Sequence, residues 1–162
     1  VLIALLLNGL IISPLRVIGN SMNPSLIDGD IVLIDKISYK FNDPKRFDLV
    51  VFPYKYDKNT NFIKRIIGLP GEKIEIINKE IFINDVELEE YYGIYDENVL
   101  TQYANYGPRE LGDDEYFVMG DNRNHSEDSR SGDVGAIKID DIIGKACFRV
   151  WPFISFGSLK YQ

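Results

Sequence analysis

The sequence predicts a mainly β protein built on antiparallel sheet, and three features indicate this class. After residue 14, runs of about four to eight residues rich in Ile, Val, Phe and Tyr recur along the chain. Turn sequences containing Gly, Pro, Asn or Asp separate these runs, as in strands joined by tight connections. No long amphipathic helical pattern follows residue 14. With 162 residues and 45% hydrophobic content, the chain can form one domain with its own core.

The individual strands follow from these signals in chain order. Strands are expected at 30–34, 48–52, 62–67, 73–77, 80–83, 115–119 and 144–150. Tight turns are expected at Asn78-Lys79 and Asn84-Asp85. A short helical turn is expected between Ile137 and Ile143. Functional side chains are therefore expected on the loops that this sheet positions.

One long stretch, residues 87–112, departs from the strand pattern. It is acidic and rich in tyrosine, it has no clear period, and glycines interrupt it at several positions. We interpret it as a variable, exposed excursion from the sheet.

The N-terminal run VLIALLLNGLII is apolar except for Asn8 and Gly9. As a helix it would extend about 18 Å, which is shorter than the roughly 30 Å hydrocarbon core of a bilayer. We interpret residues 1–14 as the C-terminal part of a transmembrane anchor helix whose upstream part is missing, and residues 15–162 as the folded domain. A buried core helix is the alternative on length. A cleaved export signal is disfavoured because no small-x-small pattern follows the run.

Composition argues against several functions. A net charge of −7 disfavours nucleic-acid binding, which needs Lys and Arg to displace counterions from phosphates. Cys147 is the single cysteine and cannot form an internal disulfide, so we expect a buried thiol. No Cys/His spacing resembles a metal site, and neither a metal nor a cofactor is expected.

The first candidate for chemistry is the small-residue turn Gly-Asn-Ser-Met-Asn-Pro-Ser-Leu at residues 19–26. Gly19 and Pro24 flank a turn that can expose Ser21, and Met22 offers an apolar surface nearby. A serine becomes a nucleophile when a base removes its proton. Without such a base, a turn residue or a helix N-cap is the ordinary role of this serine.

Two side chains could supply the base. His125 is the only histidine, but the polar loop around it is typical of a solvated side chain. Lys64 lies in a predicted strand, whose alternation places Phe62, Lys64 and Ile66 on one face. If that face is buried, desolvation lowers the pKa of Lys64 and allows it to accept a proton near neutral pH. The alternative is a lysine that extends from a sheet edge into solvent.

Four motifs in the chain resemble those of type I signal peptidases. The family patterns are Ser-Met-x-Pro-Thr-Leu, Gly-Asp followed by Ile or Val, Lys-Arg-Ile-Ile-Gly-Leu-Pro-Gly-Glu, and Gly-Asp-Asn-Arg-x-x-Ser-x-Asp-Ser-Arg. In the same order they correspond to residues 21–26, 29–32, 64–72 and 120–130, with Ser25 in place of threonine. The resemblance extends from residue 13 to about 158. Lys64 places the chain in the lysine branch of this family, beside a branch that uses histidine.

The resemblance implies a signal-peptidase-like fold, in which an antiparallel sheet or partial barrel follows a membrane-anchor helix. It also implies a serine endopeptidase with Ser21 as nucleophile and Lys64 as general base. The residues that it implies as supporting are Met22, Asp121, Asn122, Arg123, Ser126, Asp128 and Arg130. Ser126 is expected to hydrogen-bond the amine of Lys64, and Asp128 and Arg130 are expected to brace the loop.

The resemblance further implies the substrate and the location. Substrates are expected to be preprotein signal peptides with small residues at positions −1 and −3, bound extended against strands. Residues 15–18 and 30–34 are candidate pocket walls. The backbone N–H of Ser21 is the expected oxyanion donor, since Gly19 stands where some family members carry a second donor hydroxyl. We expect a single-pass protein of the cell membrane, bound to lipid, with its catalytic domain on the extracytoplasmic side.

Three other functions compete with this interpretation. An autoproteolytic Ser/Lys domain like those of SOS-response repressors shares the chemistry, but the apolar N-terminal run and the box at 120–123 disfavour it. A non-catalytic, membrane-attached peptide-binding module is disfavoured by the intact Ser21 and Lys64. A structural protein that uses the tyrosines of 87–112 for contacts is the third.

Overall fold

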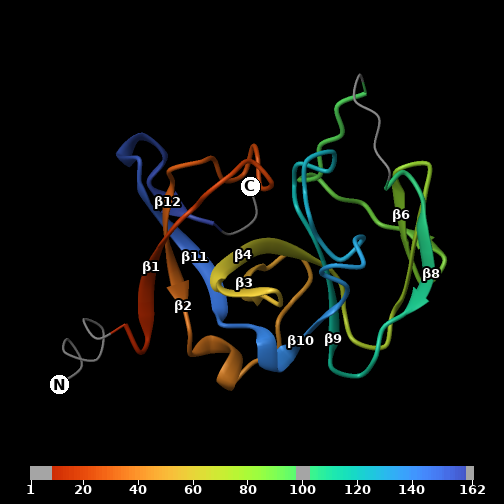
Figure 1. Cartoon of the computed structure of the whole chain (residues 1–162), viewed down its shortest axis with the longest axis horizontal. Helices are drawn as coiled ribbons and strands as arrows, with labels where there is room; N and C mark the ends of the chain where they lie inside the picture. The colour runs from red at the N-terminus through yellow and green to blue at the C-terminus, as the bar shows by residue number, and fades with distance from the viewer. Residues whose placement is uncertain (1–8, 98–102, 160–162) are drawn as a thin grey trace.

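The computed structural model describes residues 9–97 and 103–159 and arranges them as two antiparallel β-sheets (Figure 1). The larger sheet has the order β1-β2-β11-β3-β4-β9-β10, and β12 pairs with β11. Its strands are β1 (Ile12–Arg16), β2 (Ile31–Asp35), β3 (Leu49–Tyr54), β4 (Asp57–Gly68), β9 (Glu115–Met119), β10 (Ile137–Lys138), β11 (Gly144–Trp151) and β12 (Gly157–Ser158).

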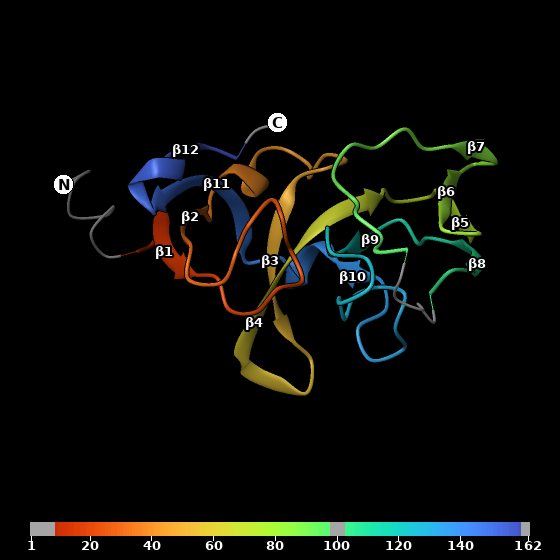
Figure 2. The same cartoon turned by 90° about the horizontal axis from the view of Figure 1, so that it is seen from above.

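The smaller sheet has the order β7-β6-β5-β8. Its strands are β5 (Lys73–Ile77), β6 (Glu80–Ile83), β7 (Val86–Glu87) and β8 (Tyr106–Glu110). Figure 2 shows this sheet at the opposite end of the molecule from β1, β2 and β12. The described residues also form three short 3-10 helices: η1 (Ser38–Lys40), η2 (Ile139–Asp141) and η3 (Phe153–Ser155).

The predicted mainly antiparallel class is confirmed. The strands expected at 73–77, 80–83 and 115–119 have these bounds, and η2 is the short helical turn expected after residue 137. At each expected turn, Asn78-Lys79 and Asn84-Asp85, both residues have positive φ. That backbone twist matches the twist of the flanking strands in a two-residue hairpin.

The stretch 87–112 contains more strand than its sequence indicates. Its first residue ends β7, and residues 106–110 form β8, which pairs with β5. The sequence pattern does not predict β8, because the strand contains a glycine and a proline, which are rare in strands. Proline is tolerated there because β8 lies at the edge of its sheet.

Among the described residues at the N-terminal end, the expected anchor helix is absent and a strand is present. Ile12, Ser13 and Pro14 are extended in β1 and pair with β2, so the boundary predicted at residue 14 falls inside a strand. Apolar composition alone does not distinguish these conformations, and the partner strand decides between them. Residues 1–8 lie outside the described residues. Within the described ranges, no helix is both long and apolar enough to cross a membrane.

The strand β4 passes through all three clusters of the hydrophobic core. Ile63, Ile67 and Ile66 belong to the first, second and third cluster, respectively. β4 pairs with β3 as far as Arg65 and with β9 from Arg65 onward. Residues 63–68 of β4 are all buried. Cys147, expected to be buried, is half-buried on β11.

Candidate active site

Lys64 and Ser21 lie in direct contact. A hydrogen bond of 2.7 Å joins Lys64 Nζ and Ser21 Oγ. Lys64 is carried by β4, opposite Val50 of β3, and only 3% of its surface is exposed. A strand at the centre of the core thus holds an amine against a serine hydroxyl from a distant part of the chain.

The environment of Lys64 favours the neutral amine. Its Nζ lies 5.1 Å from the centre of the Phe62 ring, in agreement with the alternation that places both side chains on one face. Burial lowers the pKa of Lys64 to about 8, although the negative charges of Asp128 and Asp121 act in the opposite direction. Desolvation is the larger effect because it penalises the charged ammonium form. An appreciable share of Lys64 is therefore neutral at mildly alkaline pH.

The turn that carries Ser21 is fixed from both sides. The N–H of Gly19 donates to Asp28 Oδ1 at 2.8 Å, and Gly19 has a φ of 87°, which favours glycine. The N–H of Leu26 donates to the carbonyl of Met22 at 2.9 Å. Met22 is 1% exposed and packs in the first core cluster, so it anchors the turn and does not offer the apolar surface expected of it.

The loop 120–130 joins the Ser21 turn to β4. The N–H of Asn122 donates to the carbonyl of Ser21 at 3.0 Å, and Asn122 Nδ2 donates to the carbonyl of Asn20 at 3.2 Å. Asp121 accepts two hydrogen bonds from the Arg65 guanidinium, at 2.8 and 2.7 Å. Both groups are buried, and paired donors of this kind fix orientation as well as distance.

Asp128 and Arg130 form the expected pair within this loop. Arg130 Nε and Nη2 donate to the two carboxylate oxygens of Asp128, each at 2.8 Å, and both side chains are fully buried. The Gly120 N–H also donates to Asp128, at 3.0 Å. Burial acts to raise the pKa of Asp128, but the hydrogen bonds and charge of Arg130 hold it below its usual value. Asp128 is therefore a carboxylate at neutral pH.

Ser126 does not make the hydrogen bond expected of it. Its Oγ is buried and makes no hydrogen bond to Lys64; the side chain instead lies near Asp128, whose pKa it helps to lower. The hydroxyl packs against the Gly120 backbone: a Cβ on Gly120 would lie 2.2 Å from Ser126 Oγ and 2.5 Å from the carbonyl oxygen of Ser21. Only glycine fits at position 120, and this close packing brings Ser126 beside the Ser21 turn.

A groove of about 510 Å³ opens over Ser21 and Lys64. Residues 15–20 form one wall, as expected for 15–18, and residues 59–63 of β4 form the other. The strand expected at 30–34 contributes no lining residue. His125 and Glu127 also line the groove, and His125 is exposed to solvent.

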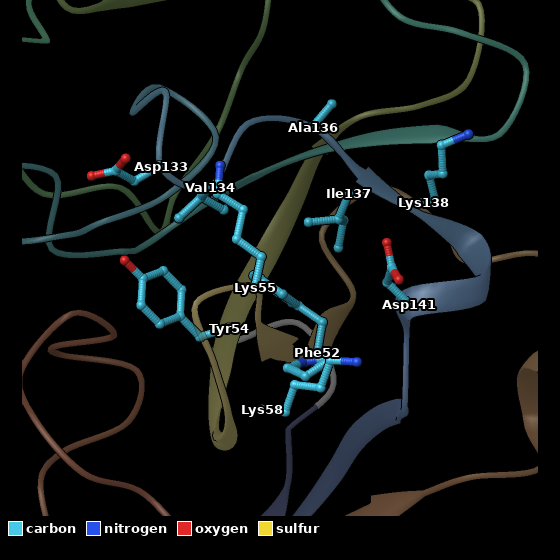
Figure 3. A pocket seen from close by; sticks show the side chains of 11 residues that line it. Phe52, Tyr54, Lys55, Lys58, Asp133, Val134, Ala136, Ile137, Lys138 and Asp141 are labelled. Atoms are coloured by element: carbon cyan, nitrogen blue, oxygen red, sulfur yellow. The ribbon is translucent and has the colours of Figure 1, made fainter.

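A second hollow, of about 370 Å³, shares no lining residue with this groove. Figure 3 shows its side chains, which come from β3, β4, the turn between these two strands, and residues 133–141. Lys55, Lys58 and Lys138 stand around apolar groups such as Phe52 and Ile137. Because it is separate from the Ser21–Lys64 pair, it plays no part in the site described above.

Some residues of the site escaped sequence reasoning. Arg123 forms an ion pair with Glu90, Arg65 lies over the ring of Tyr92, and Ile94 bridges to Asn122. All three partners come from the excursion that follows β7. In the sequence, the only local sign of these contacts is Gly93, because the Arg123 guanidinium lies against its backbone. Across residues 9–97 and 103–159, no group of three His, Cys, Asp or Glu side chains could hold a metal ion.

Comparisons with known proteins assign the class of this chain: it is a serine endopeptidase, a hydrolase. The family model described as "Signal peptidase, peptidase S26" matches residues 1–151. The chain belongs to this family. The assignment agrees with the motifs at 21–26, 64–72 and 120–130, and it disfavours the repressor-like alternative.

Individual relatives agree with this assignment. "Signal peptidase I P" of Bacillus subtilis subsp. natto is 38% identical over 165 residues, which covers 99% of this chain and 88% of that protein. "Signal peptidase IB" of Staphylococcus aureus is 35% identical over 161 residues, covering 90% of this chain and 81% of that protein. The crystal structure of a signal peptidase I from Enterococcus faecalis is similar with a TM-score of 0.51 and 32% identity. It covers 64% of this chain and 97% of the solved chain.

Proposed function

We propose that this protein removes N-terminal signal peptides from exported preproteins, with Ser21 as the nucleophile and Lys64 as the general base. The observation that carries the proposal is the 2.7 Å contact between Lys64 Nζ and Ser21 Oγ, made by a lysine whose pKa is lowered to about 8. A base within hydrogen-bond reach of the hydroxyl is what activates a serine.

The reaction is acyl transfer in two halves. Neutral Lys64 takes the proton of Ser21 as Oγ attacks the carbonyl carbon of the scissile bond. The ammonium of Lys64 then gives this proton to the departing amine of the mature protein, which leaves an ester on Ser21. In the second half, Lys64 takes a proton from water, whose oxygen attacks the ester and releases the signal peptide. The proton returns to Ser21 at the end.

The N–H of Ser21 can stabilise the oxyanion that forms during each half. Among the contacts of the described residues, this N–H donates no hydrogen bond to another protein group. The N–H of Gly19 is occupied by Asp28, and Gly19 has no hydroxyl to contribute. A preorganised donor aimed at the developing charge is a large source of rate enhancement.

The supporting residues act by holding the nucleophile turn and β4 together. Asp121 fixes Arg65, the neighbour of Lys64, and Asn122 fixes the carbonyl of Ser21. Asp128 and Arg130 brace the loop from within. We place Ser126 in this group because of its packing beside Gly120, and Met22 because it anchors the turn.

The groove suits an extended peptide. Between Asn61 and Ile63, β4 pairs with β3 on one side, while its pairing with β9 begins only at Arg65. The other edge of this half of β4 therefore lines the groove, where an extended segment can add as a further strand. Small side chains at positions −1 and −3 would point from such a strand towards the wall formed by residues 15–18.

We also propose that the protein acts at the outer face of the cell membrane as a single-pass protein. The apolar run at residues 1–12 supports an anchor, and Ile18 next to the groove is almost fully exposed. Exposed apolar side chains also gather at η3, where Phe153, Ile154 and Phe156 are open to solvent. Confining enzyme and substrate to one surface raises their effective concentration.

Cleavage of a labelled preprotein by the purified protein, in detergent or lipid, tests the proposal, with the cleavage site identified by mass spectrometry. We expect cleavage after a small residue, and no cleavage by Ser21→Ala or Lys64→Ala. Lys58→Ala is the matched control, since Lys58 is an exposed lysine on the same strand. Turnover by folded Ser21→Ala or Lys64→Ala would refute the mechanism. An inactive wild-type protein would favour a peptide-binding module.

A further inference from the structure

Residues 90–96, here called the strap, run along the loop 120–124. In Figures 1 and 2 the strap is the green segment between β7 and the grey trace, and it lies beside the loop that follows β9. Backbone hydrogen bonds join the two: the Ile94 N–H donates to the Asp121 carbonyl at 2.8 Å, and the Arg123 N–H donates to the Ile94 carbonyl at 3.0 Å. The Asp96 N–H donates to Asn124 Oδ1 at 2.8 Å. The strap is thus bonded along its length to this loop.

The strongest link between strap and loop is an ion pair. Both guanidinium Nη atoms of Arg123 donate to the carboxylate of Glu90, and the Nη2 to Oε2 distance is 2.5 Å. Arg123 is only 1% exposed. Burial acts to lower its pKa, but the hydrogen bonds and charge of Glu90 raise it above the ordinary value. Without Glu90 a buried cation would lose its counter-ion, which is costly in a medium that excludes water.

Arg123 is also fixed by close packing. Its guanidinium lies on the backbone of the strap, and a Cβ at Gly93 would stand 2.2 Å from Arg123 Cζ. On the other side, Arg123 Nε donates to the Gly120 carbonyl at 3.0 Å. The side chain therefore connects Glu90 and Gly93 of the strap to Gly120 of the loop.

The loop transmits this position to the reacting groups. Asn122, between Asp121 and Arg123, donates its N–H to the carbonyl of Ser21. The strap also contacts the strand of Lys64: the Arg65 guanidinium lies 3.8 Å from the centre of the Tyr92 ring. One short segment thus touches both supports of the pair, the loop behind Ser21 and the residue beside Lys64.

We propose that Glu90 is a positioning residue, which acts through Arg123 to hold the loop 120–124 against Ser21. This inference rests on the proposed function. Glu90 touches neither reacting atom, so its loss should leave the groove and its substrate contacts in place. What it changes is the alignment of Ser21 Oγ with Lys64 Nζ.

The test compares Glu90→Gln with Glu90→Asp and with a control at the residue that follows the strap. Glu97→Gln is that control, because Glu97 also forms an ion pair, with Lys79, but is 78% exposed. We expect Glu90→Gln to lower kcat on the order of 10- to 100-fold, as misplacement of reacting groups by about 1 Å does, with KM within about threefold of wild type. Glu90→Asp keeps the charge and should recover part of kcat, and Glu97→Gln should match wild type.

Kinetics are measured below the unfolding temperature of each variant, so that a loss of folded protein cannot imitate a fall in kcat. Wild-type kcat in folded Glu90→Gln, or a rise in KM with kcat unchanged, would overturn the proposal. If Glu90→Gln does not fold, Glu90→Asp decides: a reduced kcat supports the positioning role, and a wild-type kcat refutes it. Failure of the proposed function is separate, because it would show as Ser21→Ala retaining turnover.

Discussion

Raising the pH from about 6 to about 9 should increase the kcat/KM of this peptidase, because Lys64, the proposed general base, must be neutral to accept a proton. Burial penalises the ammonium form and lowers the pKa of Lys64 to about 8. A lysine whose pKa is lowered loses its proton, and so becomes neutral, at a lower pH than an ordinary lysine. The rise of kcat/KM with pH should therefore occur at a lower pH than the titration of a solvated lysine.

The size of the effect follows from the pKa of about 8. The neutral fraction of Lys64 is about 1% at pH 6, about 10% at pH 7, about 50% at pH 8 and about 90% at pH 9. We therefore expect kcat/KM to rise about 50-fold between pH 6 and pH 8 and less than about twofold from pH 8 to pH 9.

A fluorogenic peptide that spans a signal-peptide cleavage site provides the assay, with kcat/KM measured in detergent at constant ionic strength. His125→Ala is the control, because His125 lines the groove and is the only histidine of the sequence. The limb near pH 8 should persist in this variant. A limb that disappears in His125→Ala would assign the base to the histidine. A limb that rises only where a solvated lysine titrates would refute the effect of burial.

Two further predictions concern the loop 120–130. Gly120→Ala should lower kcat by about 100-fold or more, because its Cβ would lie 2.5 Å from the Ser21 carbonyl and displace the nucleophile turn. Gly132→Ala is the matched control, since no atom lies within 4 Å of its Cβ, and equal kcat in both variants would contradict the packing argument. Asp128→Asn should lower the free energy of unfolding by about 3–5 kcal/mol, because it leaves the buried Arg130 without its counter-ion. Urea denaturation measures this change, and a loss below about 1 kcal/mol, typical of exposed pairs, would show that the pair is not important for stability.

The sequence determined the strand content and the chemical groups of the site. Strands such as 73–77 and 115–119 are local in origin, since alternation of apolar residues and turn residues at their ends specify them. The motif order selected Ser21 and Lys64 from many serines and lysines. Alternation also placed Phe62 and Lys64 on one face of a strand, but it could not say whether that face was buried.

Tertiary structure decided what depends on contacts between distant segments. Lys64 is buried where β4 pairs with β3, and only the packing of the Ser21 turn against this strand brings it within 2.7 Å of a serine 43 residues earlier. Contact between distant segments also explains β8, because its pairing with β5 outweighs the low strand propensity of its glycine and proline. It also explains the Glu90–Arg123 pair, which joins residues 33 positions apart. Periodicity and propensity act over neighbouring residues, whereas these contacts form only when the whole chain packs.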